Sequence, residues 1–195
     1  MSVATENEEI RNMTSGKTNL CLCLNIFDID FRLKIEDWQE SQPEEDFNAR
    51  WTYDVLALKG KYIDYSLIGA ELLMSDEVSY LRDMLGALLE GKLKKDCSFR
   101  FAEPDISFKL STAKRLYDQP GRVVYRNGYM DVDIYMEMVV HFWCEGGLGA
   151  NTFSMTFNRG EIMAMYIYLL AVTETIGSDD QRVLHYLKQG VFLAE

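Results

Sequence analysis

The chain has 195 residues, of which 48% are hydrophobic and 26% are charged, and this balance favours one globular domain with a sizeable core over a disordered chain. Its 31 acidic and 20 basic side chains give a net charge of −11, which argues against nucleic acid as a partner, because Lys and Arg supply most of the affinity for phosphates. Its apolar runs are shorter than the roughly 18 residues of a membrane-spanning helix, so we expect no membrane partner either.

Residues 1–19 differ in composition from the rest of the sequence. They are polar, show no hydrophobic periodicity and carry Glu6, Glu8 and Glu9 near their start, unlike a secretion signal. We therefore expect a flexible polar tail over 1–19, a single globular domain over 20–195 and a cytoplasmic location.

The four cysteines are too few for a secreted disulfide scaffold of this length. Cys21 and Cys23 form the only close pair in the sequence, on one face of an expected strand, and no second pair matches it. Zinc sites need clustered ligands, so we expect reduced thiols, no metal site and no cofactor.

Alternating apolar residues begin the expected domain. The first run places four side chains on one face: Leu20, Leu22, Leu24 and Ile26. The apolar phase then moves by one residue, to Phe27, Ile29, Phe31, Leu33 and Ile35. Because side chains alternate strictly along a strand, this slip predicts a bulge or tight bend between two strand segments. Residues 51–58 and 61–73, joined by Lys59-Gly60-Lys61, predict a β-hairpin.

Two segments change to the helical period. The first, at about 76–90, has one apolar stripe, with Ser75 as its expected N-cap and Gly91 as its expected C-terminal cap. The second, at about 159–175, begins with Asn158 and Glu161 at the spacing of a capping box. A shorter helix is expected over about 179–189.

Strand patterns also fill the region between the two main helices. Runs at 99–101 and 106–110 predict a hairpin, and the long run 132–144 is apolar on both faces in its second half, as in a central strand. Because strands and helices do not alternate one for one, a doubly wound parallel sheet is disfavoured. The expected class is α+β, with β-rich antiparallel sheets built from hairpins and two main amphipathic helices.

The sequence shows no catalytic machinery. The glycines at 146–149 precede a strand rather than a helix, unlike a phosphate-binding loop. His141 lies between apolar neighbours and is expected in the core, and neither a nucleophile elbow nor a metal-ligand spacing occurs. We therefore expect no catalytic residues and a protein that is not an enzyme.

The most acidic segment lies between the second and third strand runs. Residues 36–46 contain six carboxylates, one proline and no base, and they predict a loop. An acidic field of this kind attracts basic protein partners, although many acidic loops serve solubility alone.

The order of several short motifs is also informative. Asp37-Trp38 is followed by Trp51-Thr-Tyr-Asp-Val55, by Glu71-Leu72-Leu73-Met74, and by Phe101 to Phe108 after the first helix. This order, over roughly residues 20–175, resembles the WapI-type immunity proteins of bacteria, and the best single match is the run Glu103-Pro104-Asp105-Ile106-Ser107-Phe108-Lys109-Leu110. The resemblance implies a non-enzymatic protein that binds and neutralises a toxin domain, often a nuclease, and it carries no catalytic residues to transfer.

The acidic segment provides the candidate contact with such a partner. A basic nuclease cleft is a suitable target for a field of carboxylates, and Trp38 is a candidate aromatic anchor among them. The candidate partner-binding residues are Glu36, Asp37, Trp38, Glu40, Glu44, Glu45 and Asp46.

Two other classes of function stay open. A small-molecule-binding or hydrolytic domain would use the polar cluster of Asp131, Asp133, Tyr135 and His141. A scaffold protein would expose a large apolar patch and self-associate. The sequence does not predict an oligomeric state.

Overall fold

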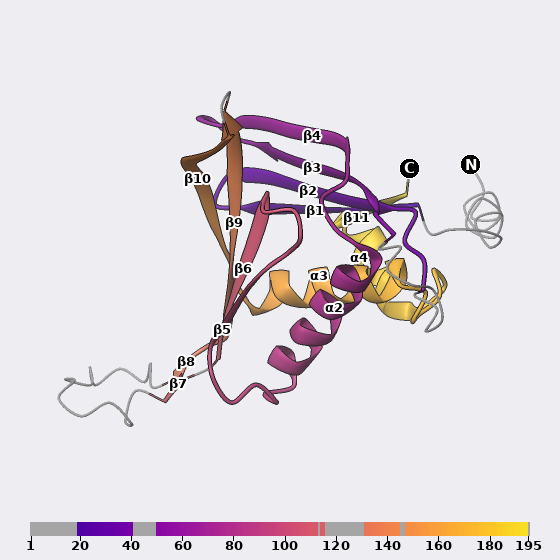
Figure 1. Ribbon diagram of the computed structural model, residues 1–195. Helices are drawn as coiled ribbons and strands as arrows, with labels where there is room; N and C mark the ends of the chain where they lie inside the picture. The colour runs from indigo at the N-terminus through magenta and orange to yellow at the C-terminus, as the bar shows by residue number, and fades with distance from the viewer. Residues whose placement is uncertain (1–18, 41–49, 113, 116–130, 145–146, 195) are drawn as a thin grey trace.

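The computed structural model describes residues 19–40, 50–112, 114–115, 131–144 and 147–194. These residues form two antiparallel sheets and three helices (Figure 1), so the predicted α+β class is confirmed. The five-stranded sheet has the order β11-β1-β2-β3-β4. Its strands are β1 (Leu20–Ile26), β2 (Ile29–Glu36), β3 (Tyr53–Lys59), β4 (Asp64–Ala70) and β11 (Phe192–Ala194).

The second sheet has four strands in the order β10-β9-β6-β5. They are β5 (Cys97–Arg100), β6 (Ile106–Ser111), β9 (Tyr135–Cys144) and β10 (Gly147–Phe157). The short strands β7 (Lys114–Arg115) and β8 (Asp131–Val132) pair with each other. Because β9 lies between β10 and β6, its prediction as a central strand is confirmed.

The helices α2 (Ser75–Leu89), α3 (Arg159–Val172) and α4 (Gln181–Lys188) lie below the five-stranded sheet in Figure 1. In α3, the Asn158 side chain accepts the N–H groups of Gly160 and Glu161, and the Glu161 carboxylate accepts the Asn158 N–H, which confirms the capping box. The residue after the C-cap of α2, Gly91, has a φ of 68°, as its predicted capping role requires.

The N-cap prediction for α2 was wrong by one residue. Met74 is the N-cap, and the Glu77 carboxylate accepts its backbone N–H at 2.9 Å. The Ser75 hydroxyl instead accepts the backbone N–H of Gln39 at 3.2 Å. The side chain that marks a helix start in the sequence therefore tethers the segment that follows β2.

The one-residue shift in the apolar pattern between β1 and β2 marks a tight turn in the structure. Phe27 and Asp28 have φ angles of 50° and 63°, which is the left-handed pair that a two-residue hairpin turn requires. The turn reverses the chain, so Leu22 lies opposite Leu33 and Leu24 opposite Phe31. The predicted bend is thus confirmed as a hairpin.

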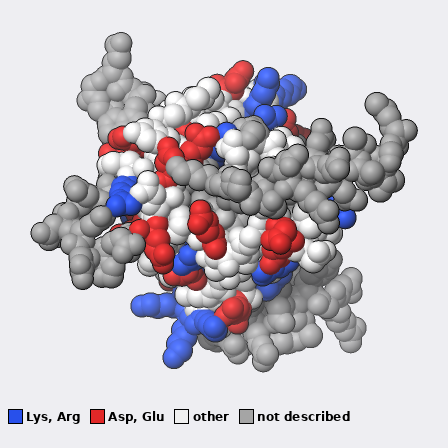
Figure 2. All heavy atoms as spheres, turned by 90° about the vertical axis from the view of Figure 1, so that its right-hand side faces the viewer, with Lys and Arg blue, Asp and Glu red and all other residues white. Residues whose placement is uncertain are grey.

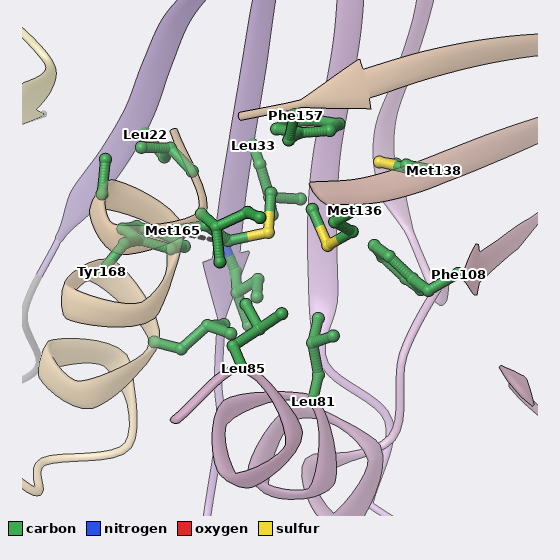
Figure 3. Close-up of a cluster of buried hydrophobic side chains, with 14 of the residues drawn as sticks. Leu22, Leu33, Leu81, Leu85, Phe108, Met136, Met138, Phe157, Met165 and Tyr168 are labelled. Atoms are coloured by element: carbon green, nitrogen blue, oxygen red, sulfur yellow. Dashed lines mark hydrogen bonds between the residues drawn. The ribbon is translucent and has the colours of Figure 1, made fainter. Parts of the chain in front are cut away.

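The core lies between the two sheets and the helices α2 and α3. Figure 3 shows side chains from all four converging: Leu22 and Leu33 from one sheet, Phe108, Met136, Met138 and Phe157 from the other, Leu81 and Leu85 from α2, and Met165 and Tyr168 from α3. Phe31 and Phe157 meet edge to face across the sheets, with ring centroids 5.4 Å apart. The helices approach closely where a Cβ at Gly86 would lie 3.1 Å from the Tyr166 ring.

A buried tyrosine hydroxyl completes the pairing of β1 with β2. The ladder between these strands ends at Cys21 and Lys34, and beyond it the Tyr168 hydroxyl accepts the Ile35 N–H at 2.8 Å and donates to the Leu20 carbonyl at 3.3 Å. Burial raises the pKa of this hydroxyl well above its usual value, so it stays protonated and able to donate. One side chain of α3 thereby ties the helix to the end of the sheet.

Tyr168→Phe should lower the free energy of unfolding by about 1–3 kcal/mol, because it leaves a buried N–H and a buried carbonyl without a partner. Urea unfolding followed by circular dichroism measures this change. Tyr166→Phe, on the same helix, is the control and should stay within about 0.5 kcal/mol of the parent chain. Equal effects of the two substitutions would show that the hydroxyl contributes nothing to the sheet.

Two further observations concern the predicted tail and membrane-spanning helices. Residues 1–18, which include most of the predicted tail, lie outside the described residues. No helix in the described ranges is both long and apolar enough to cross a membrane.

Candidate functional site

A pocket of about 360 Å³ lies at the end of the five-stranded sheet where β2 ends. Three segments that are distant in the sequence meet there: the residue before β1, the end of β2 with the residues after it, and the end of α3. The lining residues are Asn19, Ile35, Glu36, Asp37, Trp38, Val172 and Glu174. We call this site the acidic pocket.

Left-handed backbone shapes two sides of the acidic pocket. Asp37, directly after β2, has a φ of 59°, and Glu174, two residues after the end of α3, has a φ of 51°. Such values end a strand or a helix abruptly, and for non-glycine residues they are uncommon. The Glu174 N–H donates to the Ala171 carbonyl at 3.1 Å, so the turn after α3 is fixed by its own backbone.

Trp38 is held against the start of α2. Its indole N–H donates to the Ser75 carbonyl at 3.0 Å, next to the bond from the Gln39 N–H to the Ser75 hydroxyl. The ring is partly buried and packs against the hydrophobic core. Trp38 thus forms an apolar wall of the pocket beside the carboxylates of Glu36 and Asp37.

The charges around the pocket are negative. Its lining includes the carboxylates of Glu36, Asp37 and Glu174 and contains no basic residue. The last turn of α3 also carries no basic side chain to offset the negative end of the helix dipole. The Lys34 ammonium pairs with one of these carboxylates, that of Glu36, at 2.7 Å.

Figure 2 shows the side of the molecule on which β1 begins and α3 ends. Asp and Glu atoms recur across the middle of this face, whereas most of the visible Lys and Arg atoms lie toward its margins. A cationic group approaching from this side therefore meets a favourable field before any contact forms.

A further carboxylate is buried on β3, the strand next to β2. Asp54 on β3 is opposite Ile35 of the pocket lining, and it is fully buried. Its Oδ2 accepts hydrogen bonds from the Thr52 hydroxyl at 3.0 Å and from the backbone N–H groups of Leu72 and Leu73 at 3.2 and 3.1 Å. Its Oδ1 has no partner in the described part of the chain.

Burial raises the pKa of Asp54 to about 7, against the opposing effect of the bond from Thr52 and the two backbone bonds. Glu36 contributes a smaller increase through like-charge repulsion. The charge of this carboxyl is consequently sensitive to pH near neutrality.

The structure brings some of the predicted partner-binding residues together. Glu36, Asp37 and Trp38 line the acidic pocket together, and Glu40 is exposed nearby in the chain. The predicted contacts Glu44, Glu45 and Asp46 lie outside the described residues. Sequence reasoning missed Asn19, Val172 and Glu174, because only folding brings these segments to the end of β2.

The residues of the alternative hydrolytic cluster do not converge. The Asp133 carboxylate forms a two-pronged ion pair with Arg159, which lowers its pKa, and His141 contacts the Ser107 hydroxyl at 3.3 Å. Tyr135 and His141 are six positions apart on β9, a separation of about 20 Å along a strand. The Asp131 side chain lies outside the described part, and no group of three metal-binding side chains occurs in the described residues.

No family model, curated protein or solved structure matches this chain. The resemblance to WapI-type immunity proteins therefore stays a prediction from short motifs. The acidic pocket is the observation on which a function can be argued.

Proposed function

We propose that this is a non-enzymatic, cytoplasmic protein that binds and neutralises the toxic domain of a bacterial toxin, with the acidic pocket contacting a basic, nuclease-like surface. The observation that carries the proposal is the convergence of Glu36, Asp37 and Glu174 around one cavity beside Trp38. The motif resemblance in the sequence supports the same class of protein.

The chemistry of the pocket suits a lysine or arginine side chain from a partner. The carboxylates that line the pocket, one of which already pairs with Lys34, and the carbonyl end of α3 favour a positive charge. Trp38 and Val172 provide apolar contact for the aliphatic stem of such a side chain. Nuclease domains carry basic groups where they bind phosphates, so occupation of those groups would block the substrate. Charge complementarity of this kind chiefly accelerates association.

The proposal is tested by expressing the open reading frame immediately upstream of this gene with and without this protein. Growth arrest that is relieved by co-expression, together with a stoichiometric complex on size-exclusion chromatography, is the expected result. Arrest that persists despite soluble co-expression, or the absence of any complex, would contradict the proposed neutralisation.

The combined substitution Glu36→Gln, Asp37→Asn and Glu174→Gln should slow association with that upstream product by about tenfold or more at low salt and flatten the salt dependence. The stability should change by no more than about 1 kcal/mol, because these side chains are exposed. Stopped-flow mixing at several salt concentrations measures the rate.

The matched control removes the same charge from the opposite end of the same sheet. It combines Asp28→Asn, Asp30→Asn and Asp64→Asn, which lie at the β1–β2 and β3–β4 turns. This control should slow association much less than the pocket variant. If both variants slow it equally, net charge rather than the acidic pocket attracts the partner.

A further inference from the structure

A short segment between β4 and α2 is held by the buried carboxyl of Asp54. The Oδ2 atom of this carboxyl accepts the N–H groups of Leu72 and Leu73 at 3.2 and 3.1 Å. The Thr52 hydroxyl lies 3.0 Å from the same oxygen and 2.8 Å from the Leu73 carbonyl, so it joins the carboxyl to the segment a second time. We call residues 72–75 the linking segment.

The other end of the linking segment holds a wall of the acidic pocket. The Ser75 carbonyl accepts the Trp38 indole N–H at 3.0 Å, and the Ser75 hydroxyl accepts the Gln39 N–H at 3.2 Å. Ser75 comes directly after Met74, which follows Leu73. Asp54 and Trp38 are therefore attached to opposite ends of the same short piece of chain.

The linking segment is the part of this network that is free to move. Asp54 belongs to β3, which pairs with β2 on one side and with β4 on the other. Leu72 and Leu73 belong to no strand or helix. Two backbone bonds of 2.9 Å, one at Leu73 and one at Ser75, run from the segment to residues 50–52. These bonds keep the segment extended, so a displacement at Leu73 reaches Ser75.

Two titratable side chains interact electrostatically with Asp54, one from β2 and one from α3. Glu36 on β2 repels the negative form of Asp54 and adds to the rise in its pKa that burial causes. Burial raises the pKa of the Tyr168 hydroxyl on α3 well above its usual value, so that group is neutral. The linking segment has no charged side chain and offers backbone N–H groups. A negative charge on Asp54 is consequently satisfied at Oδ2 alone, because Oδ1 has no partner among the described residues.

We propose that Asp54 is a positioning residue for the acidic pocket: it fixes the linking segment, which in turn holds Trp38 as the wall of the pocket. Removal of the acceptor oxygen leaves the N–H groups of Leu72 and Leu73 without a partner. Ionisation of Asp54 favours opening of the linking segment, because water must reach Oδ1. Either change loosens Trp38. This role rests on the proposed function only in taking the acidic pocket as the place where the partner's cationic side chain binds.

The test is acrylamide quenching of Trp38 fluorescence in the full chain with Trp51→Phe and Trp143→Phe, which leaves Trp38 as the one tryptophan. At about pH 6, Asp54→Leu should raise the quenching constant by about twofold or more, because the segment opens locally. Asp54→Asn keeps an accepting oxygen and should stay close to the chain that retains Asp54.

A pH profile provides the second measurement and decides the question if Asp54→Leu does not fold. In the chain that retains Asp54, quenching should rise as the pH passes through about 7, and Asp54→Asn should remove this rise. Glu36→Gln should move the midpoint to lower pH, because Glu36 contributes to the raised pKa of Asp54.

Asp96→Leu is the matched control, because the Asp96 carboxylate also accepts a backbone N–H and a hydroxyl, both from Thr112 at 3.0 Å. It should leave Trp38 quenching unchanged. Circular dichroism shows whether each variant is folded. Unchanged quenching in folded Asp54→Leu, a pH step that persists in Asp54→Asn, or an equal rise in Asp96→Leu would each overturn the positioning role. No partner protein enters this experiment, so such a result would leave the co-expression test of neutralisation unaffected.

Discussion

The free energy of unfolding should fall by about 4 kcal/mol more in the parent chain than in Asp54→Asn as the pH rises from about 4 to about 8. Burial raises the pKa of Asp54 in the folded chain to about 7, from an ordinary value of 3.8 in the unfolded chain. Between these values the folded state holds a proton that the unfolded state has lost. The contribution of Asp54 to the free energy of unfolding is therefore fully present below about pH 4 and is lost as the pH rises through about 7.

Asn is a suitable replacement because it stays neutral at all of these pH values and keeps an oxygen that can accept the N–H groups of Leu72 and Leu73. Urea unfolding at intervals from pH 4 to pH 8 gives both curves. Asp64→Asn, an exposed carboxylate on the neighbouring strand β4, is the control and should reproduce the parent slope. Parallel curves for the parent and Asp54→Asn would contradict the assignment.

Phe157→Ala should destabilise the fold by about 3–5 kcal/mol, the usual cost of removing a fully buried aromatic ring. Phe157 is 0% exposed at the end of β10, and its ring meets Phe31 of β2 edge to face. The contact therefore joins the two sheets, and the cavity left by alanine lies where they meet. Chemical denaturation measures the change in the free energy of unfolding.

Tyr62→Ala removes an aromatic ring that is 90% exposed, and it should change stability by no more than about 0.5 kcal/mol. A double-mutant cycle that combines Phe157→Ala with Phe31→Ala should give a coupling energy of about 0.5–1.5 kcal/mol between these two rings. Similar costs for Phe157→Ala and Tyr62→Ala would mean that the two sheets do not share a core at this point.

Hydrophobic periodicity predicted most of the fold because burial alternates along β2 and β3 and follows a stripe on α2. It could not predict β11, since Phe192–Ala194 is too short to show a period and forms a strand only by pairing with β1. The N-cap of α2 was misplaced because a serine hydroxyl has several possible partners, and here it binds the Gln39 N–H.

The sequence could predict only the part of the candidate site that consists of consecutive residues. Glu36, Asp37 and Trp38 follow one another, so composition identified them together. Glu174 reaches the same pocket from the far end of α3, and no local pattern links it to Asp37. Asp54 did carry a signal, because it occupies the inward phase of β3 with Leu56 and Leu58, where a carboxylate is unexpected.

The pairing of β1 with β11 has a consequence for biosynthesis. Of the described strands, β1 leaves the ribosome first, and its outer neighbour in the sheet consists of residues 192–194. Throughout translation of the intervening chain, the backbone of β1 is an open edge that other nascent chains can pair with. This edge is therefore exposed to aggregation until β11 is made, and a premature stop that removes β11 would make the open edge permanent.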